Sequence, residues 1–334
     1  MKAGKLPLDL LSKLLDGIPQ NDPRVVVGPR AGEDAALIDF GDRYLVAKTD
    51  PITFATDLIG WYVVQVNAND LAVMGATPKW LMATLLLPEG TDADQVQLTF
   101  KQLGDACTEL GITLVGGHTE ITYDLPRPLA IGAMLGEVEK GHEVLTSGAM
   151  PGDSIVLTKG IAIEGCSILA RESAEDLRKA GVGQELIDKA AALLFSPGIS
   201  VVKDARIALE AADVHAMHDP TEGGLATGLL ELATAAHVGL TVDLDRIPVL
   251  PECSAFCEAL GLDPLGLIGS GALLATVPPE DVAALVEALE DEGIAVSEIG
   301  RVTPPEDGLK LRVGSEVRDL PVFERDELAR WLSG

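Results

Sequence analysis

Carboxylates and side-chain amides recur in three short stretches that lie beside a glycine or an apolar run. The stretches are GEDAALID with Asp34, AKTDP with Asp50, and VNANDLAVMGATP with Asn67, Asn69 and Asp70. A buried carboxylate is costly unless a cation, a metal ion or hydrogen-bond donors meet it. Magnesium prefers oxygen ligands and commonly bridges protein carboxylates to substrate phosphates. Carboxylates that converge where strand ends meet a helix would therefore hold magnesium against a nucleotide.

The stretch around Asp70 admits a second interpretation. Apolar residues from Val63 to Met74 recur at helical spacing, and Gly75 and Pro78 end the run, which predicts a helix. Asp70 could then lie in a solvated turn of an amphipathic helix, since aspartate is common in caps and loops. The pattern by itself leaves both the ligand site and the solvated turn open.

The stretch LVGGHTEIT places a glycine pair after an apolar strand. Gly116 and Gly117 lead into His118, Thr119 and Glu120. Paired glycines let backbone amides approach a phosphate, or turn the chain sharply, and either His118 or Glu120 could then touch the ligand. The lysine that a P-loop requires is absent.

The stretch MHDPTEGGLATGLLELA predicts the start of a helix. Thr221 is expected to cap this helix, and Gly223 and Gly224 would expose N–H groups toward an anion. Asp219 could bind the metal that the anion carries, and His218 adjoins it. The alternative is an ordinary aspartate and threonine that cap a helix against a strand.

Two lysines are best situated to meet phosphate, Lys48 before Asp50 and Lys159 in LTKG, although either could be a surface charge. Covalent acyl chemistry is disfavoured, because no nucleophile elbow appears and no cysteine has an activating partner. The four cysteines are expected to be reduced, small apolar core residues; they are Cys107, Cys166, Cys253 and Cys257.

The elements that must position these residues alternate along the chain. In the first half we expect strands at 44–49, 80–88, 112–117 and 128–138, with helices ending at Gly75 and Leu110. The segment 146–154 is rich in Gly, Pro, Ser and Asp and predicts a domain boundary. A second alternation follows, with strands in SIVLTKG, VHAMHD, GLTVDL, GALLATVP and AVSEIGRV and helices near 184–194, 199–212, 222–236, 253–260 and 280–292. The pattern predicts an α/β protein with domains 1–148 and 149–334.

Composition excludes several classes of partner. Acidic residues number 52 against 25 basic ones, and the net charge of −27 disfavours nucleic acid and anionic membranes. The N-terminal MKAGKLPLDLLSKLLDGIP is typical of a short amphipathic helix and not of a signal peptide, and the longest apolar runs fall short of the ~20 residues that span a bilayer. We expect a cytoplasmic protein.

Taken in order, GEDAALID, the Thr49-Asp50 pair, NANDLAVMGATP, LVGGHTE and HDPTEGGL resemble the aminoimidazole ribonucleotide (AIR) synthase-related, or PurM-like, superfamily of ATP-dependent enzymes. The second half looks most like its hydrogenase maturation branch, HypE, and the first half is equally similar to thiamine monophosphate kinase. HypE ends in an acceptor cysteine, whereas this sequence ends DELARWLSG, so we expect a different acceptor.

The resemblance implies an N-terminal sheet domain that forms a homodimer, a C-terminal α/β domain, and ATP with Mg²⁺ as cofactors. It implies that Asp34, Asp50, Asp70 and Asp219 hold magnesium, while Asn67 or Asn69 orients a ligand or a metal-bound water. The candidate catalytic residues are Asp70, His118 and Glu120, and the candidate cofactor-binding residues are Lys48, Asn67, Asn69, Gly116, Gly117, Thr119, Lys159, Thr221, Gly223 and Gly224. The first hypothesis is a HypE-like enzyme that phosphorylates an acceptor oxygen, on a small molecule or a protein. A small-molecule kinase and a non-catalytic nucleotide-binding partner protein are the alternatives.

Overall fold

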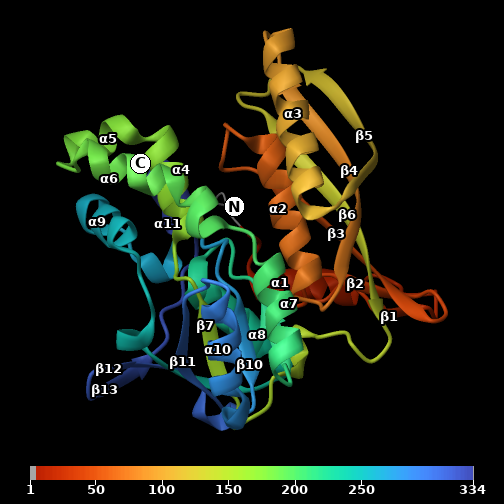
Figure 1. Ribbon diagram of the computed structural model, residues 1–334, viewed down its shortest axis with the longest axis vertical. Coiled ribbons are helices and arrows are strands. Elements are labelled where there is room, and N and C mark those ends of the chain that lie inside the picture. Colours follow the sequence, from red (N-terminus) through yellow and green to blue (C-terminus); the bar gives the residue numbers. More distant parts are fainter. Residues whose placement is uncertain (1–4, 334) are drawn as a thin grey trace. The chain divides into compact units, whose positions relative to one another are not determined.

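A computed structural model describes residues 5–333 as two compact units (Figure 1). The N-terminal unit comprises residues 20–28 and 34–143. The C-terminal unit comprises the chain as far as Pro19, residues 29–33 and the chain from Val144 onward. The expected N-terminal helix is present in its described part as α1 (Leu8–Asp16), and residues 1–4 lie outside the described chain. No described helix combines the length and the apolar character needed to cross a membrane.

A six-stranded mixed sheet forms the N-terminal unit, in the order β1-β2-β3-β6-β4-β5. Its strands are β1 (Val25–Val27), β2 (Ala36–Asp39), β3 (Arg43–Ile52), β4 (Thr77–Pro88), β5 (Thr113–Thr122) and β6 (Leu129–Glu139). Only the β4–β5 pair is parallel among the described strands of this sheet. The helices α2 (Ile59–Ala72) and α3 (Ala93–Leu110) cover one face (Figure 1).

Helix α2 is enclosed on both sides, because it packs against β3, β4 and β6 and against α3. All of its residues except Trp61 are buried. Its weak amphipathic pattern follows from this double contact, since a helix without a solvent face needs no polar stripe. The polar residues in its middle must therefore meet other parts of the protein.

A seven-stranded sheet forms the centre of the C-terminal unit, in the order β13-β12-β9-β11-β7-β10-β8. Its strands are β7 (Ser154–Thr158), β8 (Ala216–His218), β9 (Gly239–Asp243), β10 (Leu274–Val277), β11 (Val296–Thr303), β12 (Leu309–Val313) and β13 (Glu316–Asp319). Its helices are α4 (Ile163–Glu172), α5 (Ala174–Lys179), α6 (Gln184–Ala192), α7 (Val202–Ala211), α8 (Gly224–Ala236), α9 (Pro251–Leu260), α10 (Val282–Asp291) and α11 (Glu327–Leu332). The apolar side of α8 packs with β7, β9, β10 and β11 in one core.

The predicted alternation of strands and helices is confirmed in both halves, with two local corrections. The strand expected at 112–117 continues to Thr122, so the glycine pair lies inside β5 and makes no turn. The helix expected from residue 222 begins at Gly224. Several elements had no predicted counterpart, including α4, α5, α11, β12 and β13.

Candidate functional site

Four polar side chains from β3 and α2 gather within the N-terminal unit. This β3–α2 polar cluster consists of Lys48, Asp50, Asn67 and Asp70. The ammonium of Lys48 lies 3.1 Å from Oδ1 of Asp70, whose side chain is only 4% exposed. Lys48 and Asp50 are two residues apart on β3, so both side chains point to the α2 face of the sheet. The solvated-turn interpretation of Asp70 is therefore wrong.

Asn67 fixes the backbone of Asp50. Its Oδ1 accepts a hydrogen bond from the amide of Asp50 at 2.9 Å, and its Nδ2 donates to the Asp50 carbonyl at 3.2 Å and to the Val63 carbonyl at 2.9 Å. A fully buried amide that uses three of its hydrogen-bonding positions in this way is a rigid link between helix and strand. Asn67 thus positions the Asp50 backbone, a role that the sequence did not indicate, and its expected role toward a ligand or a metal-bound water stays a prediction.

Space for this link depends on a glycine in the neighbouring strand. A Cβ on Gly132, in β6, would lie 2.4 Å from Nδ2 of Asn67. The facing position is Asp50, since Gly132 pairs directly with it across β3 and β6. The sheet therefore brings the amide side chain close to the backbone at the place where Asp50 is held.

Two further predicted residues of this unit are buried, one before β2 and one in α2. Asp34 precedes β2 and is 8% exposed, and Asn69 lies in α2 and is fully buried. Each is consistent with a role in a site, because ionised and amide groups are rarely enclosed without polar partners.

The residues of the GGHTE stretch lie on a different strand. Gly116, Gly117, His118, Thr119 and Glu120 follow one another along β5, an edge strand whose side chains are exposed. Strands β6 and β4 separate β5 from β3, so the structure does not bring these residues to Asp50 and Asp70 within one chain. His118 Nε2 lies 3.3 Å from Glu120 Oε2.

Gly117 serves the packing of the sheet. Its φ is +152°, and a Cβ there would lie 2.0 Å from the carbonyl oxygen of Ala83 in β4. The pairing of β4 with β5 also shifts register at Leu81 and Met82, opposite Gly116. Gly117 lets the two strands approach closely at an irregular point, which is a structural reason for this glycine.

The start of α8 differs from the predicted cap. Gly223 is the N-cap residue, with φ of +85°, and no side chain caps α8 among the described residues, so the prediction that Thr221 caps the helix is wrong. Thr221 instead accepts hydrogen bonds at its carbonyl from the amides of Gly224 and Gly269. Two consecutive glycines with left-handed backbone conformations turn the chain into the helix. Position 224 also requires glycine for space, because a side chain there would meet the carbonyls of Leu265 and Leu267.

A carboxylate already meets this helix start. The amide of Gly223 donates to Oδ2 of Asp326 at 2.6 Å, and Oδ1 of Asp326 accepts from the Leu328 amide at 2.7 Å. Burial raises the pKa of Asp326 to about 6, and the backbone hydrogen bonds that it accepts only partly oppose that shift. Asp326 was not predicted from the sequence, although DEL at 326–328 has the pattern of a helix N-terminus.

Asp219, His218 and Lys159 are buried in the C-terminal unit. Asp219 follows β8 and is 2% exposed, and Nε2 of His218 lies 3.1 Å from Oε2 of Glu231 in α8. The ammonium of Lys159 lies 3.1 Å from Asp204 and donates to the Ser200 carbonyl at 2.6 Å. Burial lowers the pKa of Lys159, while Asp204 opposes that shift. Lys159 is thus not a surface charge.

Two family descriptions match the chain in sequence order. The N-terminal domain of AIR synthase related protein matches residues 32–138, and the C-terminal domain of the same family matches residues 150–312. The chain belongs to the AIR synthase related family. This membership confirms the resemblance drawn from the sequence motifs and the expected α/β fold with N- and C-terminal family domains.

Relatives of this family member come from both branches that the sequence indicated. The carbamoyl dehydratase HypE of Rhizobium leguminosarum bv. viciae is 30% identical and is aligned over 91% of this chain and 85% of its own. The thiamine-monophosphate kinase of Halobacterium salinarum is 32% identical, over 84% of this chain and 91% of its own. Because a dehydratase and a kinase are both enzymes, the prediction of an enzyme is confirmed.

Solved structures share the fold of this family member. A structure of the hydrogenase maturation protein HypE has a TM-score of 0.73 and 27% identity, covering 93% of this chain and 97% of that one. A HypE in complex with ATP has a TM-score of 0.69 and 23% identity, covering 96% and 91%. A ThiL protein complexed with AMPPCP and TMP has a TM-score of 0.70 and 21% identity, covering 92% of each chain.

Proposed function

We propose that this family member is an ATP- and magnesium-dependent enzyme that activates an acceptor oxygen by phosphorylation. The observation that carries the proposal is the β3–α2 polar cluster, in which a buried Asp70 and a backbone-fixed Asp50 share one face with Lys48. A HypE solved with ATP and a ThiL solved with AMPPCP support a nucleotide as the ligand.

The donor set of the cluster fits magnesium. Its acidic members offer carboxylate oxygens alone, which suit a hard cation and not a soft one. Asp50 and Asp70 would hold the ion together with Asp34, and the family resemblance gives the same role to Asp219. Magnesium, when bound, would neutralise phosphate charge and orient the nucleotide.

The residues of the chain contribute to this reaction mainly by positioning. Asn67 keeps the Asp50 backbone in place, and Lys48 supplies a positive charge beside Asp70 that could face phosphate oxygens. Groups fixed before substrate binding lower the barrier of a transfer without reorganisation at the moment of reaction. Phosphoryl transfer depends on such positioning and charge neutralisation more than on covalent catalysis.

Two reactions follow from the two branches of relatives. In the HypE-like reaction the phosphorylated oxygen leaves in a dehydration, whereas in the kinase-like reaction the phosphate stays on the acceptor. The 32% identity to a thiamine-monophosphate kinase supports the kinase-like reaction as the alternative. Product analysis separates them, because only the first reaction yields free phosphate in proportion to the dehydrated acceptor.

A homodimer through the N-terminal sheet is part of the proposal. The edge strand β5 leaves Leu114, Val115 and Ile121 between 40% and 53% exposed, and an apolar edge of this kind is typical of an interface. His118 and Glu120 lie on the same strand, so the interface would include them. Light scattering on the wild type and on Val115→Lys tests this, since a dimer should become a monomer in the variant.

The nucleotide site is tested by calorimetric titration of a non-hydrolysable ATP analogue with and without magnesium. We expect Asp70→Asn and Asp50→Asn to lose magnesium-dependent affinity by roughly tenfold or more, because each removes a metal-ligand charge. Asp105→Asn, an exposed carboxylate on α3, is the matched control and should bind as the wild type does. Asp219→Asn is measured alongside, to test its assigned role separately. Unchanged affinity in both cluster variants would leave the cluster with a purely structural role.

A further inference from the structure

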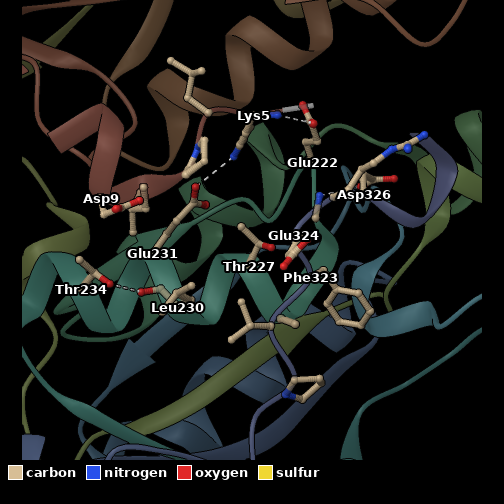
Figure 2. A pocket seen from close by; sticks show the side chains of 18 of the residues that line it. Lys5, Asp9, Glu222, Thr227, Leu230, Glu231, Thr234, Phe323, Glu324 and Asp326 are labelled. Atoms are coloured by element: carbon tan, nitrogen blue, oxygen red, sulfur yellow. Dashed lines mark hydrogen bonds and ion pairs between the residues drawn. The ribbon is translucent and has the colours of Figure 1, made fainter. Parts of the chain in front are cut away.

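A cavity of about 830 Å³ lies within the C-terminal unit along one side of α8 (Figure 2). It is lined by residues between 5 and 12, by α8 with the preceding Glu222, and by residues 321–326. Segments from near both ends of the chain thus meet one helix around a single cavity. Its volume is in the range of ~300–1,000 Å³ that is common for small-molecule sites. The β3–α2 polar cluster contributes none of the described lining residues.

The walls of this α8 cavity are largely apolar. Leu6, Leu230, Val322 and Phe323 line it, and Leu6 and Val322 are 43% and 73% exposed. Large apolar side chains left in contact with water around a cavity favour a ligand that covers them. The occupant should therefore have an apolar body.

The polar lining of the cavity is predominantly acidic. Five carboxylates belong to it, from Asp9, Glu222, Glu231, Glu324 and Asp326, against two cations, Lys5 and Arg325. Figure 2 shows these acidic side chains distributed around Thr227 on α8. This excess of negative charge favours a cation over an anion as the ligand.

One of these carboxylates is held in its ionised form. Oε2 of Glu231 lies 3.1 Å from Nε2 of His218, and Oε1 lies 3.1 Å from the ammonium of Lys5. Burial by itself would raise the pKa of Glu231, but the His218 hydrogen bond and the Lys5 charge outweigh burial and lower the pKa to about 2. Glu231 is therefore ionised and is paired with Lys5 and His218 on the α8 side of the cavity.

The contacts of Lys5 show which kind of group the carboxylates of the cavity bind. Its backbone amide donates to Oε1 of Glu222 at 2.7 Å while its ammonium reaches Glu231, as the dashed lines in Figure 2 mark. A primary ammonium on an alkyl chain thus already lies against the cavity's carboxylates. The amide of Gly223, which would otherwise attract an anion, donates to Asp326.

We propose that the α8 cavity binds a small organic cation, an amine or quaternary ammonium on an apolar body. The apolar part would lie against Leu230, Val322 and Phe323, and the cationic group would face the lining carboxylates of Asp9 and Glu324. The site goes beyond the nucleotide chemistry proposed above and does not depend on it. Binding to the cavity is therefore measured without ATP, so that a failure of the cation site can be told apart from a failure of the proposed nucleotide site.

The test uses three probes of one shape, which are 4-phenylbutylamine, 4-phenylbutanol and 4-phenylbutyrate at pH 7. Calorimetric titration of the full chain should show the amine binding at least roughly tenfold tighter than the alcohol and the carboxylate. The variant Asp9→Asn/Glu324→Gln removes two exposed lining charges. It should weaken the binding of the amine by roughly five- to tenfold and leave the affinity for the alcohol unchanged. The control Glu290→Gln/Asp307→Asn removes the same charge from exposed positions outside the cavity and should have no effect.

A cavity-filling variant, Leu230→Trp, locates the binding. It should abolish amine binding while circular dichroism and the melting temperature confirm a folded chain. Equal affinity for the three probes, or no binding of the amine at millimolar concentration, would overturn the proposal. Amine binding that persists in Leu230→Trp would place the ligand elsewhere and would overturn it as well.

Discussion

The ammonium of Lys48 lies 3.1 Å from Oδ1 of Asp70, and this pair joins β3 to the enclosed helix α2. The Asp70 side chain is 4% exposed and that of Lys48 is 23% exposed, so water screens the pair only in part. Removing one partner of such a pair leaves a charge with reduced compensation in a low-dielectric region. Loss of one member should therefore destabilise the folded protein more than loss of both.

We expect Lys48→Met to lower the free energy of unfolding by about 2 kcal/mol in magnesium-free buffer, less than the ~3–5 kcal/mol of a fully buried pair. The double variant Lys48→Met/Asp70→Asn should be more stable than Lys48→Met alone, because no buried charge is left behind. Urea unfolding of the four proteins measures this coupling. Additive losses would show that the two side chains act independently.

The contact between Gly223 and Asp326 predicts a specific pH dependence of stability. Because the folded pKa of Asp326 is raised from 3.8 to about 6, its contribution to stability is greatest below pH 3.8 and is lost as the pH rises through 6. Asparagine at this position can still cap α11 but cannot titrate. The free energy of unfolding of the wild type minus that of Asp326→Asn should fall by about 2 kcal/mol from pH 4 to pH 7. Denaturant unfolding at both pH values checks this, and a constant difference would assign Asp326 an ordinary pKa.

Replacement of Gly132 tests the link between Asn67 and Asp50. A methyl group there would press on the Asn67 amide, so Gly132→Ala should lower the free energy of unfolding by about 1–3 kcal/mol and weaken magnesium-dependent nucleotide binding. Gly104→Ala is the control, because a Cβ at this exposed helical glycine of α3 meets nothing within 4 Å. In the control the free energy of unfolding should be unchanged or raised by about 0.5–1 kcal/mol. Equal effects of the two substitutions would contradict the prediction that a side chain at position 132 presses on Asn67.

The four cysteines should react slowly in the folded protein. Burial raises the pKa of the Cys107 thiol to about 11, and burial together with neighbouring Cys253 and Cys257 raises the pKa of Cys166. Thiolates are the reactive form, so few are present at pH 8. Titration with a chromogenic disulfide at pH 8 should detect less than one thiol in minutes, and four after denaturation in guanidinium. Rapid reaction of a native thiol would contradict the burial of these side chains.

The order of strands and helices could be predicted from local patterns. Apolar runs such as 80–88 and 128–138, and stop signals such as Gly75, reflect periodicities that the backbone imposes over a few residues. The polar positions in α2 were also visible, since Asn67 and Asp70 interrupt an apolar run. Charge and composition depend on no contact at all, so they too were available from the sequence.

The partners of those polar residues came from the tertiary structure. Asn67 meets Asp50 and Lys48 meets Asp70 because the sheet lays β3 against α2, and no local pattern encodes that approach. Likewise, Asp326 reaches Gly223 across 103 positions of the chain. The sequence determined which residues could carry charge and which segments would be regular, because both are local properties. Packing decided which charges meet, since pairings between distant segments depend on how whole elements bury their apolar faces.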